Sequence, residues 1–285
     1  MNGSTTPKIG RYGVFAAPSR QGPDVRAEAV AELEELGFSA VWAGNSTIEE
    51  AAGLVAATSR IVVATGIQGI WHYDAARTAE RYAELEATYP GRFLLGLGVS
   101  HPEFIEGYQR PYTAMTDYLD ALDSAPAPVP RERRVLAALG PRMLRLARDR
   151  SAGAFPYLVT VEQVAAARQI LGEGPLLAPE LGIVLKTDPD RARALARGAL
   201  QPYLRLTNYA DNWLRGGFAE DDLADGGSDR LVDELFAWGD DARIRARIEA
   251  FQAAGADHVV LQSISRHGPA RPPREDWRRL AELLR

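Results

Sequence analysis

The sequence contains no cysteine, which excludes disulfides, thiolate catalysis and metal sites built on cysteine. It has only four histidines, and His, Asp and Glu nowhere gather with the spacing of a metal site. No apolar run approaches the roughly 18 residues of a membrane-spanning helix. The N-terminal stretch MNGSTTPKIG lacks the apolar segment of a signal peptide. We therefore expect a cytoplasmic protein that binds neither a metal nor a membrane.

An excess of positive charge is also missing. The 33 Lys and Arg and 38 Asp and Glu give a net charge of −5, which argues against binding to nucleic acid. Hydrophobic residues at 46% and charged residues at 25% are typical of a globular protein with a large core. No change in composition divides the 285 residues, so we expect a single domain over 1–285.

Short apolar runs alternate with helical patterns along the chain. Eight runs indicate strands, at 9–17, 39–44, 60–67, 93–98, 133–140, 153–159, 179–186 and 257–264. Helices are expected at 24–37, 47–58, 74–89, 111–123, 141–150, 161–171, 188–205, 240–254 and 275–284. Residues 206–230 break the pattern and are interpreted as an insertion with short helices before the last strand. Eight βα units predict a (β/α)₈ TIM barrel, with an open doubly wound sheet as the alternative.

Ligands bind where the strands of such a barrel end, so these exits are the residues to examine. The stretch FLLGLGVSHP begins like a dinucleotide fingerprint, but His101 stands where the third glycine is needed. Glycine ends four consecutive strands, at Gly44, Gly66, Gly98 and Gly140. Ordinary turn chemistry explains any one of them. Together they predict a flat ligand across one side of the barrel mouth.

Few other side chains at the exits carry chemistry. His72 and His101 follow the third and fourth strands, and either can donate a hydrogen bond to a substrate or a reduced ring. His258 is expected to be structural and His267 solvated. The stripe Arg142, Arg145 and Arg148 indicates a solvated helix face or, alternatively, a rim that steers anions. Trp71, Phe104, Tyr108 and Tyr112 are candidates for an apolar cleft, whereas Trp42 is expected in the core.

Five stretches, in this order and spacing, carry a resemblance to a known family: SAVWAGNS, RIVVATGIQGIW, YPGRFLLGLGVSH, RVLAALGPRMLRLARDRSAGAFPYLVT and GSDRLVDELFAWGD. The chain resembles the luciferase-like flavin and deazaflavin oxidoreductases, and within them the branch that uses coenzyme F420. The resemblance implies a TIM barrel with an insertion and a homodimer. It also implies an oxidoreductase that passes a hydride between the deazaflavin and a small organic substrate.

The resemblance also implies a site. A non-prolyl cis peptide would lie in a bulge near Gly66-Ile67, behind the deazaflavin ring, and would bend that ring. The phosphate tail would lie toward the exits of the fourth and sixth strands. The cofactor-binding residues implied are Gly44, Asn45, Thr65, Gly66, Ile67, Gly98, Val99, Ser100, Ala152, Gly153, Ala154 and Tyr157.

The chain departs from this family at one informative place. Many relatives that use F420 carry an Asp-His pair at the exit of the second strand, where this chain has Gly44-Asn45-Ser46. Asn45 can hydrogen-bond a ring edge but cannot serve as an acid. Asn45 and His101 are the catalytic candidates, with Tyr157 or water as other proton sources. The alternative functions are a flavin mononucleotide (FMN)-dependent luciferase-like monooxygenase and a barrel that binds a flavin without turnover.

Overall fold

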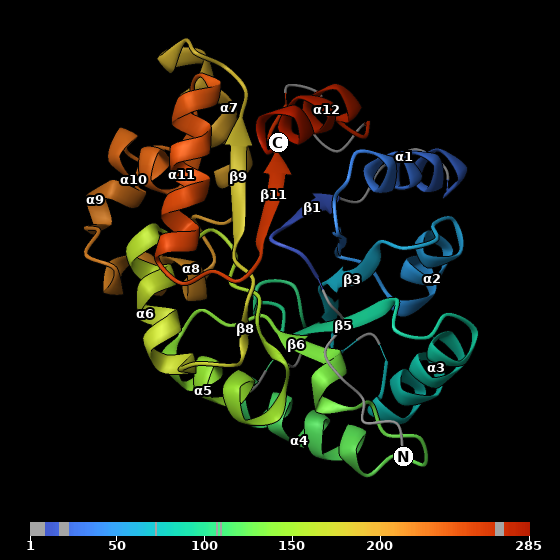
Figure 1. Ribbon diagram of the computed structural model, residues 1–285. Coiled ribbons are helices and arrows are strands. Elements are labelled where there is room, and N and C mark those ends of the chain that lie inside the picture. The colour runs from blue at the N-terminus through green and yellow to red at the C-terminus, as the bar shows by residue number, and fades with distance from the viewer. Residues whose placement is uncertain (1–8, 17–22, 72, 107, 109, 266–270) are drawn as a thin grey trace.

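The computed structural model describes residues 9–16, 23–71, 73–106, 108, 110–265 and 271–285. Within them, parallel strands form one curled sheet with helices around it (Figure 1). The strands are β1 Tyr12–Ala16, β2 Ala40–Gly44, β3 Val62–Gly66, β4 Gln68–Gly69, β5 Phe93–Gly98, β6 Arg134–Leu136, β7 Gly153–Ala154, β8 Leu176–Leu177, β9 Glu180–Val184, β10 Phe236–Trp238 and β11 Val259–Ser263. These segments are apolar on both faces because a parallel sheet is covered on both sides.

The sheet closes on itself. Hydrogen-bonded neighbours run in the order β10-β9-β11-β1-β2-β3-β5-β6-β7-β8, with β4 beside β5. Only Ala178 and Pro179 separate β8 from β9. The Ala178 N–H donates to the Ala154 carbonyl of β7 at 3.0 Å, and Pro179 accepts from the Val260 N–H of β11 at 2.9 Å. β8 and β9 are thus one interrupted strand that joins β7 to β11. The ring has the eight strands predicted, and the open sheet was the wrong alternative.

The helices follow the predicted order. They are α1 Pro23–Glu35, α2 Ile48–Ala56, α3 Ala75–Thr88, α4 Pro111–Asp123, α5 Pro141–Arg150, α6 Val161–Leu171, α7 Pro189–Leu200, α8 Thr207–Arg215, α9 Glu220–Leu223, α10 Asp229–Leu235, α11 Asp241–Ala253 and α12 Arg274–Leu283, with a 3₁₀ turn at Arg131–Arg133. Thr47 begins α2 with a capping box, and the Asp74 side chain accepts from the Arg77 N–H at the start of α3.

Three hydrophobic clusters divide the interior. The largest lies between the outer face of the strands and the surrounding helices. A smaller one fills the ring itself, where Trp42 is fully buried and stacks on Phe155 with ring centroids 4.4 Å apart. The third joins α7, α8 and α10 to β9 and β10. Trp42 is therefore a core residue, as predicted, and the ring is packed rather than hollow.

Some element bounds differ from those predicted. β6 and β7 are much shorter than the runs 133–140 and 153–159, since Pro156 has no N–H to continue the ladder. Helix α7 ends at Leu200 rather than near 205, because Pro202 cannot extend it. β4 and β10 were not predicted, because two and three residues are too short to show a period.

The segment predicted as an insertion with short helices, 206–230, holds α8 and α9 and the start of α10. It packs closely on the barrel. The indole N–H of Trp213, fully buried on α8, donates to the Leu158 carbonyl at 3.0 Å. The side chain of Gln163 on α6 donates to the Asn212 carbonyl at 2.7 Å. These contacts fix α8 against the end of the barrel where β7 exits.

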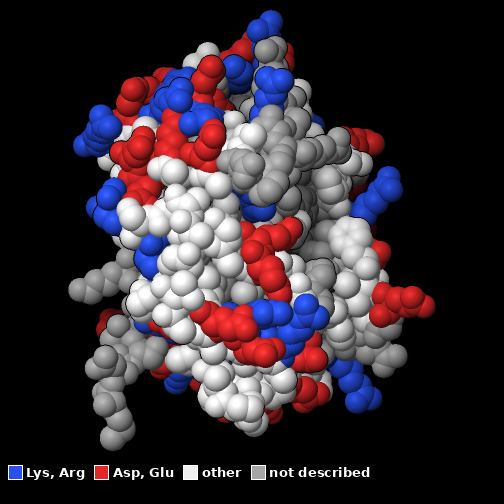
Figure 2. Space-filling model, turned by 90° about the vertical axis from the view of Figure 1, so that its right-hand side faces the viewer, with Lys and Arg blue, Asp and Glu red and all other residues white. Residues whose placement is uncertain are grey.

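The surface carries charges of both signs. Figure 2 shows the face that bears α1, α2 and α3, on which acidic and basic groups are interspersed. Among the helices that the structure describes, none is long and apolar enough to cross a membrane.

Candidate active site

One large cavity, of about 1220 Å³, opens at the C-terminal ends of the strands. Its lining comes from the exits of β1, β2, β3, β5, β6, β7 and β11, with helices α1, α7 and α8 along its sides. Most of the lining is apolar, with polar and charged side chains from several elements among it, as in sites for small molecules. The predicted mouth of the barrel is therefore where the cavity lies.

The β3 exit forms the bulge that the resemblance implied. Ala64 pairs with Leu94 and Gln68 with Leu97, so β3 and β4 advance four residues while β5 advances three. The peptide bond between Gly66 and Ile67 is cis. Thr65 bridges the gap in the ladder, because its hydroxyl donates to the Gly96 carbonyl and accepts from the Gly96 N–H, both at 2.8 Å.

The glycines of β5 make room for this bulge. A Cβ on Gly96 would lie 2.0 Å from the Thr65 carbonyl oxygen, and a Cβ on Gly98 would lie 2.6 Å from Cδ1 of Ile67. Neither position accepts a side chain without movement of the bulge. The absence of side chains at Gly96 and Gly98 thus serves first to let β3 approach β5 closely. Gly98 and Ile67 also line the cavity.

Asn45 lies beside the bulge at the β2 exit. Its backbone N–H donates to the Gly66 carbonyl at 3.2 Å, and its φ of 44° is left-handed, a conformation that asparagine tolerates better than most residues. The side chain is exposed at the cavity wall. An asparagine therefore suits this position for two separate reasons: it tolerates the left-handed backbone, and its polar side chain lines the cavity.

Tyrosines cover the opposite wall. Tyr157 donates from its hydroxyl to Oε1 of Gln262 at 2.8 Å, and the Tyr203 hydroxyl lies 3.5 Å from that of Tyr157. The rings of Tyr203 and Tyr209 meet at right angles, 5.1 Å apart. Burial raises the pKa of Tyr157 and of Tyr209 well above its usual value. Tyr157 therefore stays protonated at neutral pH and can act as a hydrogen-bond donor, not as a base.

A buried carboxyl lies behind these phenols. Glu180, at the start of β9, is 1% exposed. Its Oε2 accepts from the Leu158 N–H at 3.3 Å, and its Oε1 has no partner. Burial raises the pKa of Glu180 to about 8, against the smaller opposing effect of the Leu158 hydrogen bond. The side chain is thus mainly protonated at neutral pH.

His101 also faces the cavity, at the β5 exit. Its Nδ1 is 2.8 Å from Oδ1 of Asn208 on α8, and its ring packs against Phe104 and Tyr209. Burial lowers the pKa of His101, although the Asn208 contact and the nearby Glu103 oppose that shift. The imidazole is therefore neutral at pH 7 and links the β5 exit to α8.

The part of the cavity next to His101 carries groups that favour anions, and we call it the anion-binding corner. Ser100, with a left-handed φ of 58°, lines the cavity beside Gly140, which begins α5 without a side-chain cap. Pro141 at the first position of α5 has no N–H, but the next N–H groups at the start of the helix have no helical partners and favour negative charge. Nη2 of Arg215 lies 3.7 Å from where a Cβ on Gly140 would be. Hydroxyl, helix N-terminus and guanidinium thus gather at one end of the cavity.

The sequence is similar to proteins of a known family. A model of the family described as luciferase-like monooxygenase matches residues 11–258. The chain belongs to this family. A Mycobacterium tuberculosis protein provisionally named as a coenzyme F420-dependent oxidoreductase is 23% identical to it over 85% of this chain and 91% of that protein.

Solved structures of luciferase-like proteins share the fold. An F420-dependent secondary alcohol dehydrogenase, in complex with an F420–acetone adduct, matches with a TM-score of 0.72 and 16% identity over 97% of this chain and 99% of that one. The oxygenating constituent of 3,6-diketocamphane monooxygenase from Pseudomonas putida, in complex with FMN, matches with a TM-score of 0.68 and 13% identity, covering 97% of each chain. Both cofactor classes therefore occur on this barrel.

The luciferase-like barrel brings many of the predicted residues together. Asn45, Gly66, Ile67, Gly98, Val99, Ser100, His101 and Tyr157 all line the cavity. Gly44, Thr65, Ala152, Gly153 and Ala154 do not. Thr65 and Ala154 are fully buried, and a Cβ on Gly153 would lie 1.9 Å from the Leu176 carbonyl oxygen of β8. The neighbours of these five residues belong to the sheet, so we assign them a structural role in it. His72 and His267 lie outside the described residues.

The other predicted side chains also have places. His258 is fully buried, accepts from the Trp42 indole N–H at 3.2 Å and contacts the Gly10 carbonyl, as expected of a structural histidine. Phe104 and Tyr108 line the cavity, while the Trp71 indole donates to the Val99 carbonyl at 2.7 Å. Arg142 stacks over Tyr112 on the outer face of α5.

Sequence reasoning did not find several lining residues. Tyr203, Asn208, Tyr209 and Arg215 follow α7 or lie on α8, in a segment without clear periodicity, and Gln262 sits inside a strand. Arg26 lies on α1 with Ala29 and Val30, at positions i, i+3 and i+4, so the three share one face of the helix. That spacing was the only signal that pointed from Arg26 toward the interior.

Proposed function

We propose that this luciferase-like protein is an oxidoreductase that uses coenzyme F420 and passes a hydride between the deazaflavin and a small organic substrate. One observation carries the proposal: the cavity joins a wall of small residues at the β3 bulge to the anion-binding corner at Ser100, Gly140 and Arg215. A flat ring with a phosphate tail has this shape and charge. The provisional name of the Mycobacterium tuberculosis relative supports the same cofactor.

The residues present fit such a cofactor. The bulge with Gly66 and Ile67, held by Thr65 and Gly98, would back the ring, and Asn45 would hydrogen-bond its edge. Ser100, the first N–H groups of α5 and Arg215 would hold the phosphate tail. When bound, the deazaflavin supplies the two-electron chemistry, and the chain supplies position and a protected cleft.

Tyr157 is the proposed donor to the substrate oxygen. Its hydroxyl donates its single proton to Gln262 in this structure and would turn from Gln262 to the substrate oxygen, and the phenol stays protonated at neutral pH. This assignment takes the place of the histidine that F420-dependent relatives carry near Asn45. His101, neutral and bound to Asn208, is proposed to shape the substrate end and to join α8 to the barrel.

The tail assignment is tested by titrating F420 into the wild type and into Arg215→Gln, followed by fluorescence. We expect about tenfold weaker binding to the variant, because a charge-assisted contact is lost. Arg145→Gln, an exposed change on α5 away from the cavity, serves as the matched control and should bind as the wild type does. Equal affinity for all three proteins would refute the assignment.

An FMN-dependent monooxygenase is the second candidate. The family's description and the FMN-bound structural neighbour favour it, since FMN also joins a flat ring to a phosphate. The two candidate functions differ in their chemistry, because a monooxygenase must react with dioxygen and a deazaflavin does so poorly.

We further propose that the protein is cytoplasmic and a homodimer.

A further inference from the structure

Arg26 is an arginine whose side chain reaches the cavity. It points from α1 into the cavity, half-buried, beside the exits of β1 and β2. Its Nη2 donates to Oγ of Ser46 at 2.9 Å, and Ser46 is itself 1% exposed. Its Nε is buried and has no hydrogen-bond acceptor. Part of the guanidinium is therefore positioned by the protein and part is left without a partner.

No carboxylate balances this charge among the side chains that the structure describes. Arg134, which is more deeply buried, pairs with Asp123 at 2.6 Å, whereas Arg26 has no ion pair of this kind. The charge of Glu50 acts on it from a distance, and that carboxylate is occupied in the capping box of α2. The neighbouring segment 17–22 contains no Asp or Glu in its sequence.

A half-buried charge without a partner is unfavourable, and burial lowers the pKa of Arg26 accordingly. Among the described side chains, the charge of Glu50 opposes this effect only in part. A ligand oxyanion would do so more fully, because guanidinium N–H groups match carboxylate and phosphate oxygens well. The Ser46 contact holds the guanidinium in place before any ligand arrives, which reduces the entropy lost on binding.

The position of Arg26 separates it from the anion-binding corner. β1 and β6 are four strands apart in the ring of eight, so they stand on opposite sides of the mouth. Arg26 lies at the β1 and β2 exits, and Gly140 with Arg215 lies beyond β6. The proposed tail site and Arg26 therefore face each other across the cavity. Asn45, at the β2 exit, lies on the same side as Arg26.

We propose that Arg26, positioned by Ser46, is a specificity-determining residue that binds the carboxylate or phosphate of an anionic substrate. This inference rests on the proposed function for its reaction but not for its binding site. The apolar body of such a substrate would lie against the aromatic wall of Phe15 and Tyr157. Neutral alcohols and carbonyl compounds of the same shape would bind less well.

The test uses benzoate and benzamide, which share shape and differ in charge, titrated calorimetrically into the apo protein. We expect the wild type to bind benzoate about tenfold more tightly than benzamide. Arg26→Met should abolish that preference, while Arg215→Met and the exposed control Arg245→Met should keep it. Phenyl phosphate, titrated alongside, identifies which oxyanion is preferred. A wild type without the preference, or a preference that survives Arg26→Met, would overturn the proposal.

Two further measurements distinguish a failure of this inference from a failure of the proposed function. Because the charge is unpartnered, Arg26→Met should unfold at the same temperature as the wild type or a higher one; a clear loss would mean that Arg26 is structural and would overturn the proposal. Arg26→Met should also retain F420 affinity. Benzoate preference without F420 binding refutes the proposed function alone, and F420 binding without that preference refutes this inference alone.

Discussion

Glu180 shows how one buried residue sets a dependence of stability on pH. Its pKa is about 8 in the folded protein against about 4.3 in an unfolded chain. The folded state therefore keeps a proton that the unfolded state releases. This contribution to stability is complete below about pH 4 and is lost as the pH rises through 8.

Glu180→Gln should remove this dependence. Relative to the wild type, the variant should gain about 5 kcal/mol in the free energy of unfolding at pH 8, and the gain should shrink toward pH 4. Urea unfolding at several pH values measures the difference. Glu173→Gln, an exposed change, is the control. Parallel curves for wild type and Glu180→Gln would show that Glu180 is ionised in the folded state.

The glycine pair of β5 gives a second prediction for single residues. Gly96→Ala should lower the free energy of unfolding by about 3 kcal/mol, because its Cβ would meet rigid backbone 2.0 Å away. Gly98→Ala should lower it by only about 1–2 kcal/mol, because Ile67 can shift, but it should weaken cofactor binding. Gly53→Ala, in open space on α2, should raise stability by about 0.5–1 kcal/mol. Equal losses at Gly96 and Gly98 would contradict the bulge geometry.

Single residues were predicted from sequence only where their chemistry was local. Asn45, Gly98 and His101 follow strands directly, so their place at the mouth follows from the barrel. Thr65 and Gly153 were assigned to the cofactor, yet their neighbours are strands of the sheet. A contact between residues 31 positions apart, such as that of Thr65 with Gly96, leaves no local pattern in the sequence.

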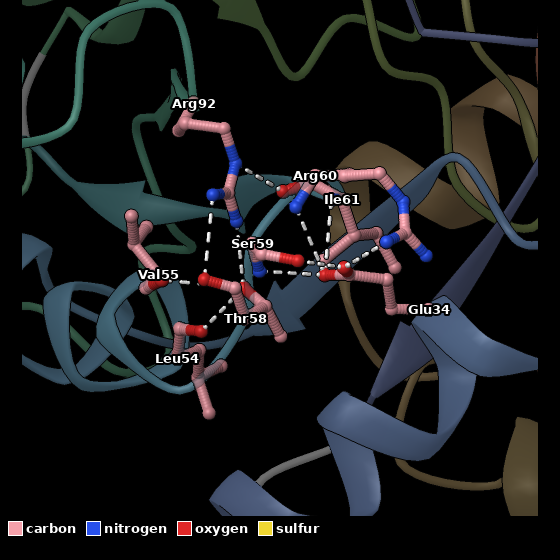
Figure 3. Close-up of polar contacts among 8 residues, drawn as sticks. All are labelled: Glu34, Leu54, Val55, Thr58, Ser59, Arg60, Ile61 and Arg92. Atoms are coloured by element: carbon pink, nitrogen blue, oxygen red, sulfur yellow. Dashed lines mark hydrogen bonds and ion pairs between the residues drawn. The ribbon is translucent and has the colours of Figure 1, made fainter.

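At the scale of elements, Glu34 ties α1 to the chain that enters β3. Its carboxylate accepts from the backbone N–H groups of Ser59, Arg60 and Ile61 and from the Ser59 hydroxyl, while Arg92 holds the same turn through Thr58 and Ile61 (Figure 3). Burial alone would raise the pKa of Glu34, but these hydrogen bonds outweigh it and lower the pKa to about 2. The bottom of β3 is thereby fixed, opposite the end that carries the bulge.

Glu34→Gln should destabilise the protein by about 1–2 kcal/mol at pH 7, since the charge-assisted hydrogen bonds are lost. A lowered folded-state pKa contributes stability above about pH 4, and that contribution disappears as the pH falls toward 2. The difference between wild type and variant should therefore shrink in acid, as followed by chemical unfolding. The exposed neighbour Glu35→Gln should have no such effect, and a difference that persists unchanged in acid would contradict the assignment.

Elements were predictable where their period was long enough to see. The helices predicted to start at Thr47, Asp74 and Pro141 begin within one residue of those positions. The predicted run 179–186 contains β9, whereas β8 was missed because its two residues are too short to show a period. β10 stayed hidden because FAW continues directly from α10.

At the scale of the whole molecule, the closed ring arranges charge across the mouth. Arg26 lies on one side and Arg215 on the other, with the bulge and the tyrosine wall between them. The pattern of the sequence predicted the barrel, and the resemblance to the family implied the bulge. The sequence did not predict which arginines reach the cavity, because that depends on how α1 and α8 pack against strands far away in the chain.

The central claim is that this cavity holds coenzyme F420, and a side-by-side binding titration of the wild type with F420 and FMN tests it most directly. Absorbance and fluorescence of both ligands follow binding under identical conditions. We expect tight binding of F420 and much weaker binding of FMN. A preference for FMN would contradict it and support the monooxygenase, and failure to bind either ligand would mean that the cavity serves another class of molecule.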